Sequence, residues 1–335
     1  MAAKNMVKGT MSNESFITLS MLAVLAGLFI VASLFVPRFF DIRTISNQLS
    51  QQAELIILAI SVTFILISGN FDLSVGGIVG LGAVLSAYFC QRSTGAGLAL
   101  ARGLGMPYGV AIAATLVCCM GIGAINAFFV TRMKVASIIV TLGTMSLARG
   151  IALILTQGSQ RSSGLPYIYK KFGGFSLIGT INGSVVLMII LISIALIIEK
   201  KTVFGRRTYY IGANPIAAKL SGIQVEKHIS LLYLVSSFLA GVVGVIMGSI
   251  HNAGISSLGE GVEFDALVIT LLGGTSIMGG FGSVLGTVVG AFILGILSTS
   301  LNMLGLSPDI QTIVKGVVTL IAILAQRFAL DHRKT

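Results

Sequence analysis

One acidic side chain stands where an apolar run of the sequence is broken. Asp72 follows a long apolar stretch, with Asn70 and Phe71 before it and Ser74 after it. A carboxylate or hydroxyl here can accept hydrogen bonds from the free N–H groups that begin the next helix. Alternatively, the chain is broken at membrane depth, where irregular backbone is tolerated if it lines a cavity or is buried in protein. The pattern therefore predicts a helix cap, a pathway or gate, or both.

A second polar stretch, Glu199 to Lys227, separates two long apolar runs and carries the densest positive charge in the chain. Within it the sequence predicts a short helix with defined ends. Asn214 can cap it, Pro215 suits its first position, and Gly222 supplies a left-handed stop. A two-turn helix is marginal alone in water, so the bilayer edge, the rest of the chain or a partner must hold it. The residues assigned to this helix and its ends are Gly212, Ala213, Asn214, Pro215, Ala217, Ala218, Lys219, Leu220, Ser221 and Gly222.

Motifs for catalysis are absent from the sequence. It contains no Gly-x-x-x-x-Gly-Lys-Ser/Thr pattern, so we do not expect ATP to bind through a P-loop. The three histidines and three cysteines show no metal-ligand spacing. We therefore expect that the chain is not an enzyme and that it binds no cofactor and no metal.

Composition assigns the chain to the membrane. Hydrophobic residues make up 55% and charged residues 10% of it, and its mean hydropathy is +0.99. Soluble domains carry about 25% charged residues, so the lipid bilayer is the expected solvent. The formal net charge of +11 does not indicate a nucleic-acid partner, because the basic residues lie between apolar runs.

The apolar runs predict an all-α, polytopic membrane protein with about ten transmembrane helices of roughly twenty residues each. We expect one domain over residues 1–335, with residues 199–228 as a loop that contains the short helix. The eighth run is short and glycine-rich, which leaves nine or eleven spans open. The predicted spans are Phe16–Val36, Ala53–Gly69, Val75–Cys90, Val110–Val130, Ser137–Thr156, Ser184–Ile198, Ile229–His251, Ala266–Met278, Ser283–Asn302 and Gln311–Phe328.

The distribution of lysine and arginine predicts the orientation, because cytoplasmic loops carry an excess of both. The best fit places both termini and the Asn214 helix in the cytoplasm. Arg149 and Lys315 fall inside predicted spans. Each either extends its charge to the membrane surface or has a role in span pairing or transport.

Glycine recurs at intervals of four along the ninth run. Gly282, Gly286 and Gly290 predict a flat face that lets helices approach closely or lines a pathway. Residues 67–77 and 272–282 echo one another, since each joins an apolar run to a glycine-rich one. Repeated halves are common in transport proteins.

Three blocks of the chain, residues 68–76, 212–223 and 272–286, carry a resemblance to a known family. The chain resembles the membrane permease subunits of bacterial ATP-binding-cassette importers, in the branch that handles monosaccharides such as ribose, arabinose, xylose and galactose, and autoinducer-2. Many members of that branch have Gly-Ile where this chain has Asn70 and Phe71. With smaller matches between the blocks, the resemblance covers nearly the whole chain in order.

This resemblance implies a translocation pathway in the bacterial inner membrane that works by alternating access. The Asn214 helix would be the coupling helix that docks into a cytoplasmic ATP-binding subunit, where ATP is hydrolysed. A second permease copy, identical or not, and an extracytoplasmic sugar-binding protein complete the expected partners. Thr141 and Thr144, with Asn70, Asp72 and their neighbours, are candidates for the pathway.

Two alternatives remain open from the sequence. An ion-gradient-driven secondary transporter would need carboxylates or interrupted helices at mid-membrane, for which Asp72 alone is thin support. The same permease role could also serve autoinducer-2 or branched-chain amino acids. The block from Asp72 to Gly76 favours the sugar branch.

Overall fold

The computed structural model describes residues 21–36, 39–92, 103–173, 176–178, 181–307, 309–318 and 320, and most of these residues are helical. A helix over Met21–Phe35 comes first. The elements that follow are α2 (Ile42–Ile67), α3 (Ser74–Cys90), α4 (Tyr108–Ala127), the π-helix η2 (Phe128–Arg132), α5 (Ser137–Thr156), α6 (Tyr167–Gly173), β1 (Ser176–Ile178), β2 (Ile181–Asn182), α7 (Gly183–Lys201), α8 (Val203–Ala213), α9 (Pro215–Leu220), α10 (Val225–His251), α11 (Val262–Leu272) and α12 (Val284–Met303).

Six of the described helices are long and apolar enough to cross a membrane. They are Thr44–Ile67, Tyr108–Arg132, Ser137–Thr156, Gly183–Lys201, Val225–His251 and Val284–Met303. Met21–Phe35 and α3 are apolar but shorter. The count of about ten spans therefore stays a prediction, and parts of its first and last spans lie outside the described residues.

The eighth predicted span, Ala266–Met278, is wrong in its boundaries. The helix there is α11, which has 11 residues and ends at Leu272. Glycines with positive φ follow at 274, 279 and 280. This backbone geometry suits glycine and ends a helix, so the glycine-rich residues after Leu272 form a folded connection and do not continue α11.

Helix α3 lies at the centre of the molecule. Every residue of α3 except Tyr88 and Phe89 is buried, and the helix packs against α10, α5, α4 and α11. In the helices α4, α5 and α7, by contrast, less than a third of the residues in the most apolar stretch are buried. Because exposed apolar surface is stable in lipid, these outer helices suit contact with the bilayer.

Glycines allow α3 to approach its neighbours closely. A Cβ added at Gly82 would lie 3.1 Å from the carbonyl oxygen of Gly241 on α10. Helix α12 uses the same device, because a Cβ at Gly290 would lie 2.5 Å from the carbonyl oxygen of Ile269 on α11 and one at Gly286 would overlap Gly273. Gly282 is a correction to the predicted glycine face: it precedes α12 and has φ +150°, so only two of the three glycines share that helix.

The echo between residues 67–77 and 272–282 has a counterpart in the backbone. Gly69 and Gly274 have φ of +79° and +83°. In both segments the glycine N–H bonds to the carbonyl of the third residue before it. The N–H of the residue after the glycine bonds to the carbonyl of the fifth residue before that one. The two segments therefore end α2 and α11 with the same turn.

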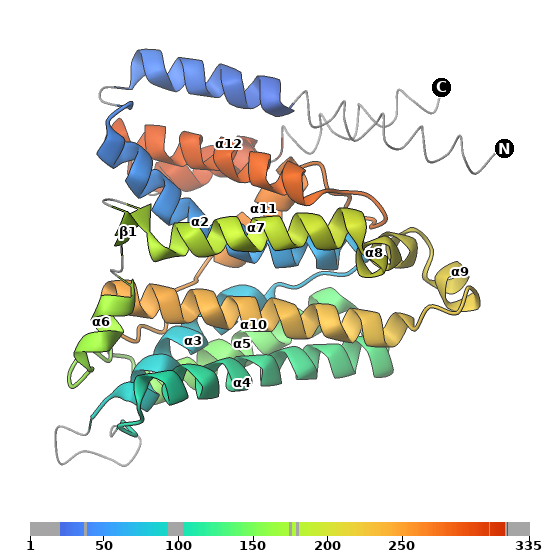
Figure 1. Ribbon diagram of the computed structural model, residues 1–335, viewed down its shortest axis with the longest axis horizontal. Coiled ribbons are helices and arrows are strands. Elements are labelled where there is room, and N and C mark those ends of the chain that lie inside the picture. Colours follow the sequence, from blue (N-terminus) through green and yellow to red (C-terminus); the bar gives the residue numbers. More distant parts are fainter. Residues whose placement is uncertain are drawn as a thin grey trace.

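The described elements have two distinct ends (Figure 1). Helix α9 lies at one end, beyond the ends of α8 and α10, while α6 and β1 lie at the opposite end. Residues 157–183, which lie between the fifth and sixth predicted spans, contain α6 and the short antiparallel pair β1 and β2. Below, these are called the α9 end and the α6 end.

Candidate functional site

The short helix α9 has the ends that its sequence predicts. The Asn214 side-chain oxygen accepts bonds from the backbone N–H groups of Ile216 and Ala217, each at 3.0 Å. Pro215 occupies the first turn. Gly222 has φ +82°, and its N–H bonds to the carbonyl of Lys219 at 3.0 Å. Both ends are thus fixed by local contacts, as a rigid rod requires.

One side of α9 packs on the protein. Ala218 is buried in a small apolar cluster with Ile211 of α8 and Val225 of α10. The Glu226 carboxylate at the start of α10 accepts bonds from Lys219 at 3.1 Å and from Lys134 at 3.3 Å. These exposed ion pairs add little stability, but they tie α9 to α10 and to the segment before α5.

The other side of α9 is bare apolar surface. Ile216 is 73% exposed and Leu220 is 85% exposed. They lie four positions apart, so both occupy one face of the helix. A short, capped helix with two projecting apolar side chains is well suited to insertion into a groove on another protein.

The three sequence blocks meet in space beside α9, at a place that we call the junction: residues 67–69, 212–213 and 279–280. The Gly280 N–H bonds to the carbonyl of Ile67 at 2.8 Å. A Cβ at Gly212 would overlap the Ile67 carbonyl, and one at Gly279 would lie 2.7 Å from the Gly69 Cα. Backbone therefore packs directly on backbone where α2, α8 and the α11–α12 connection meet.

Helix α8 is fastened to its surroundings. Its Thr208 hydroxyl bonds to the His228 ring at 2.8 Å, and Phe204 stacks on the same ring at 4.2 Å between centroids. The Glu199 carboxylate accepts bonds from the Tyr209 hydroxyl at 2.8 Å and from the Val284 N–H at 3.1 Å. Because Val284 is the first residue of α12, Glu199 caps that helix from α7.

Asp72 is buried, with 3% of its surface exposed, and it anchors a polar network. One carboxylate oxygen accepts bonds from the Ser74 N–H at 3.0 Å and the Ser74 hydroxyl at 2.5 Å. The other accepts a bond from the Ser236 hydroxyl of α10 at 2.7 Å. Asp72 therefore bonds to the first N–H of α3, as the capping interpretation expects, and it also fixes α10.

The network continues through α4 to α5. The Asn126 amide donates to the Ser74 hydroxyl at 2.8 Å, and its oxygen accepts from Thr144 at 2.6 Å. The Ser236 hydroxyl also lies 3.4 Å from the Ser61 hydroxyl. We call these six residues the buried polar network: Ser61, Asp72, Ser74, Asn126, Thr144 and Ser236. Asn126 and Ser236 escaped the sequence reasoning, although an asparagine within a long apolar run is itself a signal.

The other candidate pathway residues lie nearby in different environments. Thr141 is buried and donates to the backbone of its own helix at Ser137. Asn70 is partly buried and bonds back to Ser68. The Phe71 carbonyl accepts a bond from the Tyr233 hydroxyl at 2.9 Å. The structure thus gathers Asp72, Ser74 and Thr144 into one network and leaves Thr141 outside it.

Both basic residues predicted within spans form ion pairs. Arg149 of α5 contacts Glu263 at 2.7 Å, and the Glu263 side chain is 1% exposed. Lys315 contacts Asp265 at 3.1 Å. Of the two alternatives for these side chains, span pairing is the one that these contacts support.

Comparison with known proteins identifies the family. Residues 44–323 match the family model described as "Branched-chain amino acid transport system / permease component". The ribose import permease protein of Escherichia coli (strain K12) is 36% identical over 308 residues, which cover 91% of this chain and 92% of the relative.

Two further relatives have similar coverage. The ribose import permease protein of Bacillus subtilis (strain 168) is 35% identical over 301 residues, covering 90% of this chain and 89% of that protein. The galactose/methyl galactoside import permease protein of Escherichia coli (strain K12) is 32% identical over 305 residues, covering 89% of each chain. Together with the six long apolar helices among the described residues, these matches establish that the chain belongs to the branched-chain amino acid transport system / permease component family and is a multipass membrane permease, not an enzyme.

Proposed function

We propose that the chain is the membrane-spanning subunit of an ATP-binding-cassette importer and forms the translocation pathway for a monosaccharide. The observation that carries this proposal is the junction, where the end of α8, directly before α9, packs on the end of α2 and on the α11–α12 connection. A push on α9 would reach the segment that holds Asp72 through direct backbone contacts rather than through flexible side chains.

The proposal includes an orientation and an assembly. The chain lies in the bacterial inner membrane as one permease domain, with about ten spans, both termini and α9 in the cytoplasm. Two permease chains pair, and each of two ATP-binding subunits binds one α9 helix. Ile216 and Leu220 of α9 insert into a groove of that subunit. An extracytoplasmic binding protein delivers the cargo at the α6 end.

Coupling between α9 and the pathway follows from the contacts. Helix α9 packs on α10 through the buried cluster of Ala218 and Val225, and α10 contributes Ser236 to the buried polar network. A shift of α10 relative to α3 must therefore strain or exchange the bonds to Asp72. Transport is directional only if the cargo's affinity differs between the two states, and such an exchange provides two discrete arrangements.

The cargo assignment rests on the sugar-importing relatives and on the chemistry of the candidate pathway. A neutral polyol is recognised by hydroxyl and amide groups, which Ser74, Asn126 and Thr144 supply. Selection among monosaccharides belongs mainly to the binding protein, which is a different chain.

Uptake by reconstituted vesicles tests the function. With the binding protein present on the α6 side, the full chain and its co-purified ATP-binding subunits should import radiolabelled ribose or galactose only when ATP is supplied on the α9 side. Uptake by the chain alone under a sodium or proton gradient would contradict the proposal and favour a secondary transporter.

Substitutions on α9 test the docking surface. Ile216→Ser and Leu220→Ser leave the contacts of Ala218 intact, so the protein should insert normally but lose most of its bound ATPase and its uptake. Tyr167→Ser on α6, where Tyr167 is 80% exposed, is the matched control at the opposite end. Equal ATPase recovery from all three variants would refute docking through α9.

A further inference from the structure

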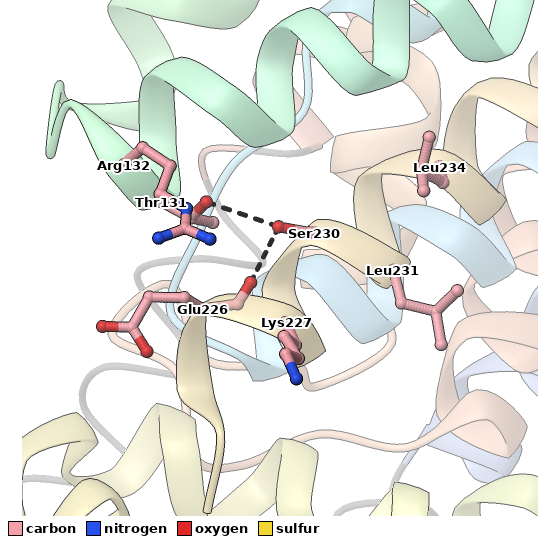
Figure 2. Close-up of a pocket in the computed structure, with 7 residues that line it drawn as sticks. All are labelled: Thr131, Arg132, Glu226, Lys227, Ser230, Leu231 and Leu234. Atoms are coloured by element: carbon pink, nitrogen blue, oxygen red, sulfur yellow. Dashed lines mark hydrogen bonds between the residues drawn. The ribbon is translucent and has the colours of Figure 1, made fainter.

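A pocket of about 280 Å³ lies at the α9 end, between η2 and the start of α10. Its volume is at the lower limit of small-molecule pockets, which span about 300–1,000 Å³. Figure 2 shows its lining side chains: Thr131, Arg132, Glu226, Lys227, Ser230, Leu231 and Leu234. None of the sequence blocks that mark the family includes these residues.

The pocket has an excess of positive charge. Arg132 and Lys227 are exposed, and neither forms a salt bridge with any residue in the described part of the chain. The one carboxylate in the lining, Glu226, already binds Lys134 and Lys219. Two cations are therefore available to an anion at this site.

Hydroxyl groups lie between the charges. The Thr131 and Ser230 oxygens are 3.3 Å apart, and the Ser230 hydroxyl also donates to the Glu226 carbonyl at 2.8 Å (Figure 2). The Thr131 hydroxyl donates to the Ala127 carbonyl at 2.7 Å. Because hydroxyl groups rotate, each of the two can turn its hydrogen from its backbone acceptor toward a bound oxygen. Arg132 and Thr131 belong to η2, and π-helical turns within α-helices often occur at functional sites.

The pocket continues into an apolar face of α10. Leu231 and Leu234 belong to its lining. Beyond them Val235 is 43% exposed and Phe238 is 38% exposed, four and seven positions after Leu231. These side chains share one face of a helix that is long enough to span the bilayer. The site thus combines a cationic pocket that hydroxyl groups line with an adjoining apolar helix face, at the end of a helix long enough to span the bilayer.

We propose that this pocket binds the headgroup of an anionic phospholipid, with an acyl chain along the Leu231–Phe238 face of α10. The phosphate would lie between Arg132 and Lys227, and the hydroxyl groups of Thr131 and Ser230 would orient it. A soluble phosphate would use the cations but not the apolar face. Basic pockets between spans commonly bind anionic headgroups. The lining includes Glu226 at the start of α10, so a bound headgroup would stabilise the position of that helix end.

Binding of fluorescent dioctanoyl phosphatidylglycerol to the purified full chain in neutral detergent tests this proposal. A basic residue near an anionic surface contributes about fivefold in affinity, so Arg132→Gln with Lys227→Gln should weaken binding about 25-fold. The control pair, Lys201→Gln with Arg206→Gln, removes the same charge from exposed residues outside the pocket and should weaken binding less than about threefold.

Competition with unlabelled probes separates a lipid from a free anion. Phosphatidylglycerol should displace the fluorescent lipid, whereas phosphatidylcholine, glycerophosphoglycerol and inorganic phosphate should fail at the same concentration. Equal losses in the two charge pairs, or equal competition by glycerophosphoglycerol, would overturn the lipid site. Because this assay needs no ATPase and no sugar, it can fail while the proposed import function stands.

Discussion

Asp72 shows how one side chain can connect several helices. Its carboxylate accepts bonds from the backbone and hydroxyl of Ser74 and from the hydroxyl of Ser236. Each of these donors is buried and would be costly to leave without an acceptor. A single carboxylate therefore fixes the start of α3 against α10.

Replacing Asp72 tests this arrangement. Asp72→Ala should lower the free energy of unfolding by about 1–3 kcal/mol for each donor left unsatisfied. Asp72→Asn should cost less, because it keeps an acceptor for Ser74 and can donate to the Ser236 oxygen. Denaturant unfolding in detergent measures both. The control is Ser146→Ala, at an exposed serine that bonds to its own helix, and it should change the stability little.

The pair of Arg149 and Glu263 carries a second prediction. Arg149→Met leaves the nearly inaccessible Glu263 carboxylate without its cation, which costs about 3–5 kcal/mol for a buried pair. Adding Glu263→Gln removes that charge, so the double variant should be more stable than Arg149→Met alone. Lys134→Met, in an exposed pair, should cost about 0–1 kcal/mol. A double variant less stable than Arg149→Met would mean that the carboxylate is held by other groups.

Local and distant contacts differ in how far the sequence predicts them. The roles of Asn214, Pro215 and Gly222 depend on neighbours within a few positions, so the residue types alone predict the ends of α9. Asn126 bonds to Ser74, 52 positions away, and no local pattern indicates that partner. Glu263 and Arg149 are also far apart in the sequence, so their pairing cannot be predicted before the packing of the helices is known.

At the scale of elements, the junction depends on glycine at sites where two backbones touch. Gly212 lies within α8, with no unusual φ, so its role is close approach and not a turn. Glycine inside a helix normally destabilises it by about 0.5–1 kcal/mol relative to alanine. The contact with Ile67 gives a structural reason for that cost.

Alanine at two glycines separates these effects. Gly212→Ala should destabilise the protein by about 1–3 kcal/mol through overpacking and reduce uptake, because its Cβ overlaps the Ile67 carbonyl. Gly121→Ala in α4 meets no atom within 4 Å and should stabilise by about 0.5–1 kcal/mol. Thermal unfolding of both variants, with uptake measured in parallel, makes the comparison. If Gly212→Ala behaved like Gly121→Ala, the backbone contact would not matter.

The boundaries of the helices are only partly predictable from the periodicity and composition of the sequence. Apolar runs predict the cores of α4, α5, α7, α10 and α12, because each must bury or present apolar surface to lipid. They fail at α11, where the same apolar and glycine-rich composition also suits a folded connection. They also omit α8, which is held by Glu199, Thr208 and His228 through contacts with other helices.

At the scale of the molecule, the two ends have different characters. The α9 end holds the projecting apolar side chains, the junction and the cationic pocket, whereas the α6 end holds a short helix and a two-stranded pair. A permease that is driven from one side and loaded from the other needs this asymmetry. This division of roles between the two ends requires that they face opposite sides of the membrane.

Cysteine labelling tests that orientation. In a variant whose native cysteines are replaced by serine, Ser221→Cys beside α9 should react with a membrane-impermeant maleimide only in inside-out vesicles. Tyr167→Cys on α6 should react only in spheroplasts, since both positions are exposed in the protein but lie at opposite ends (Figure 1). Labelling of both residues from one side would mean that the long helices between them do not cross the bilayer. Labelling of Ser221→Cys from outside would place α9 beyond the reach of a cytoplasmic ATPase and refute the driven importer.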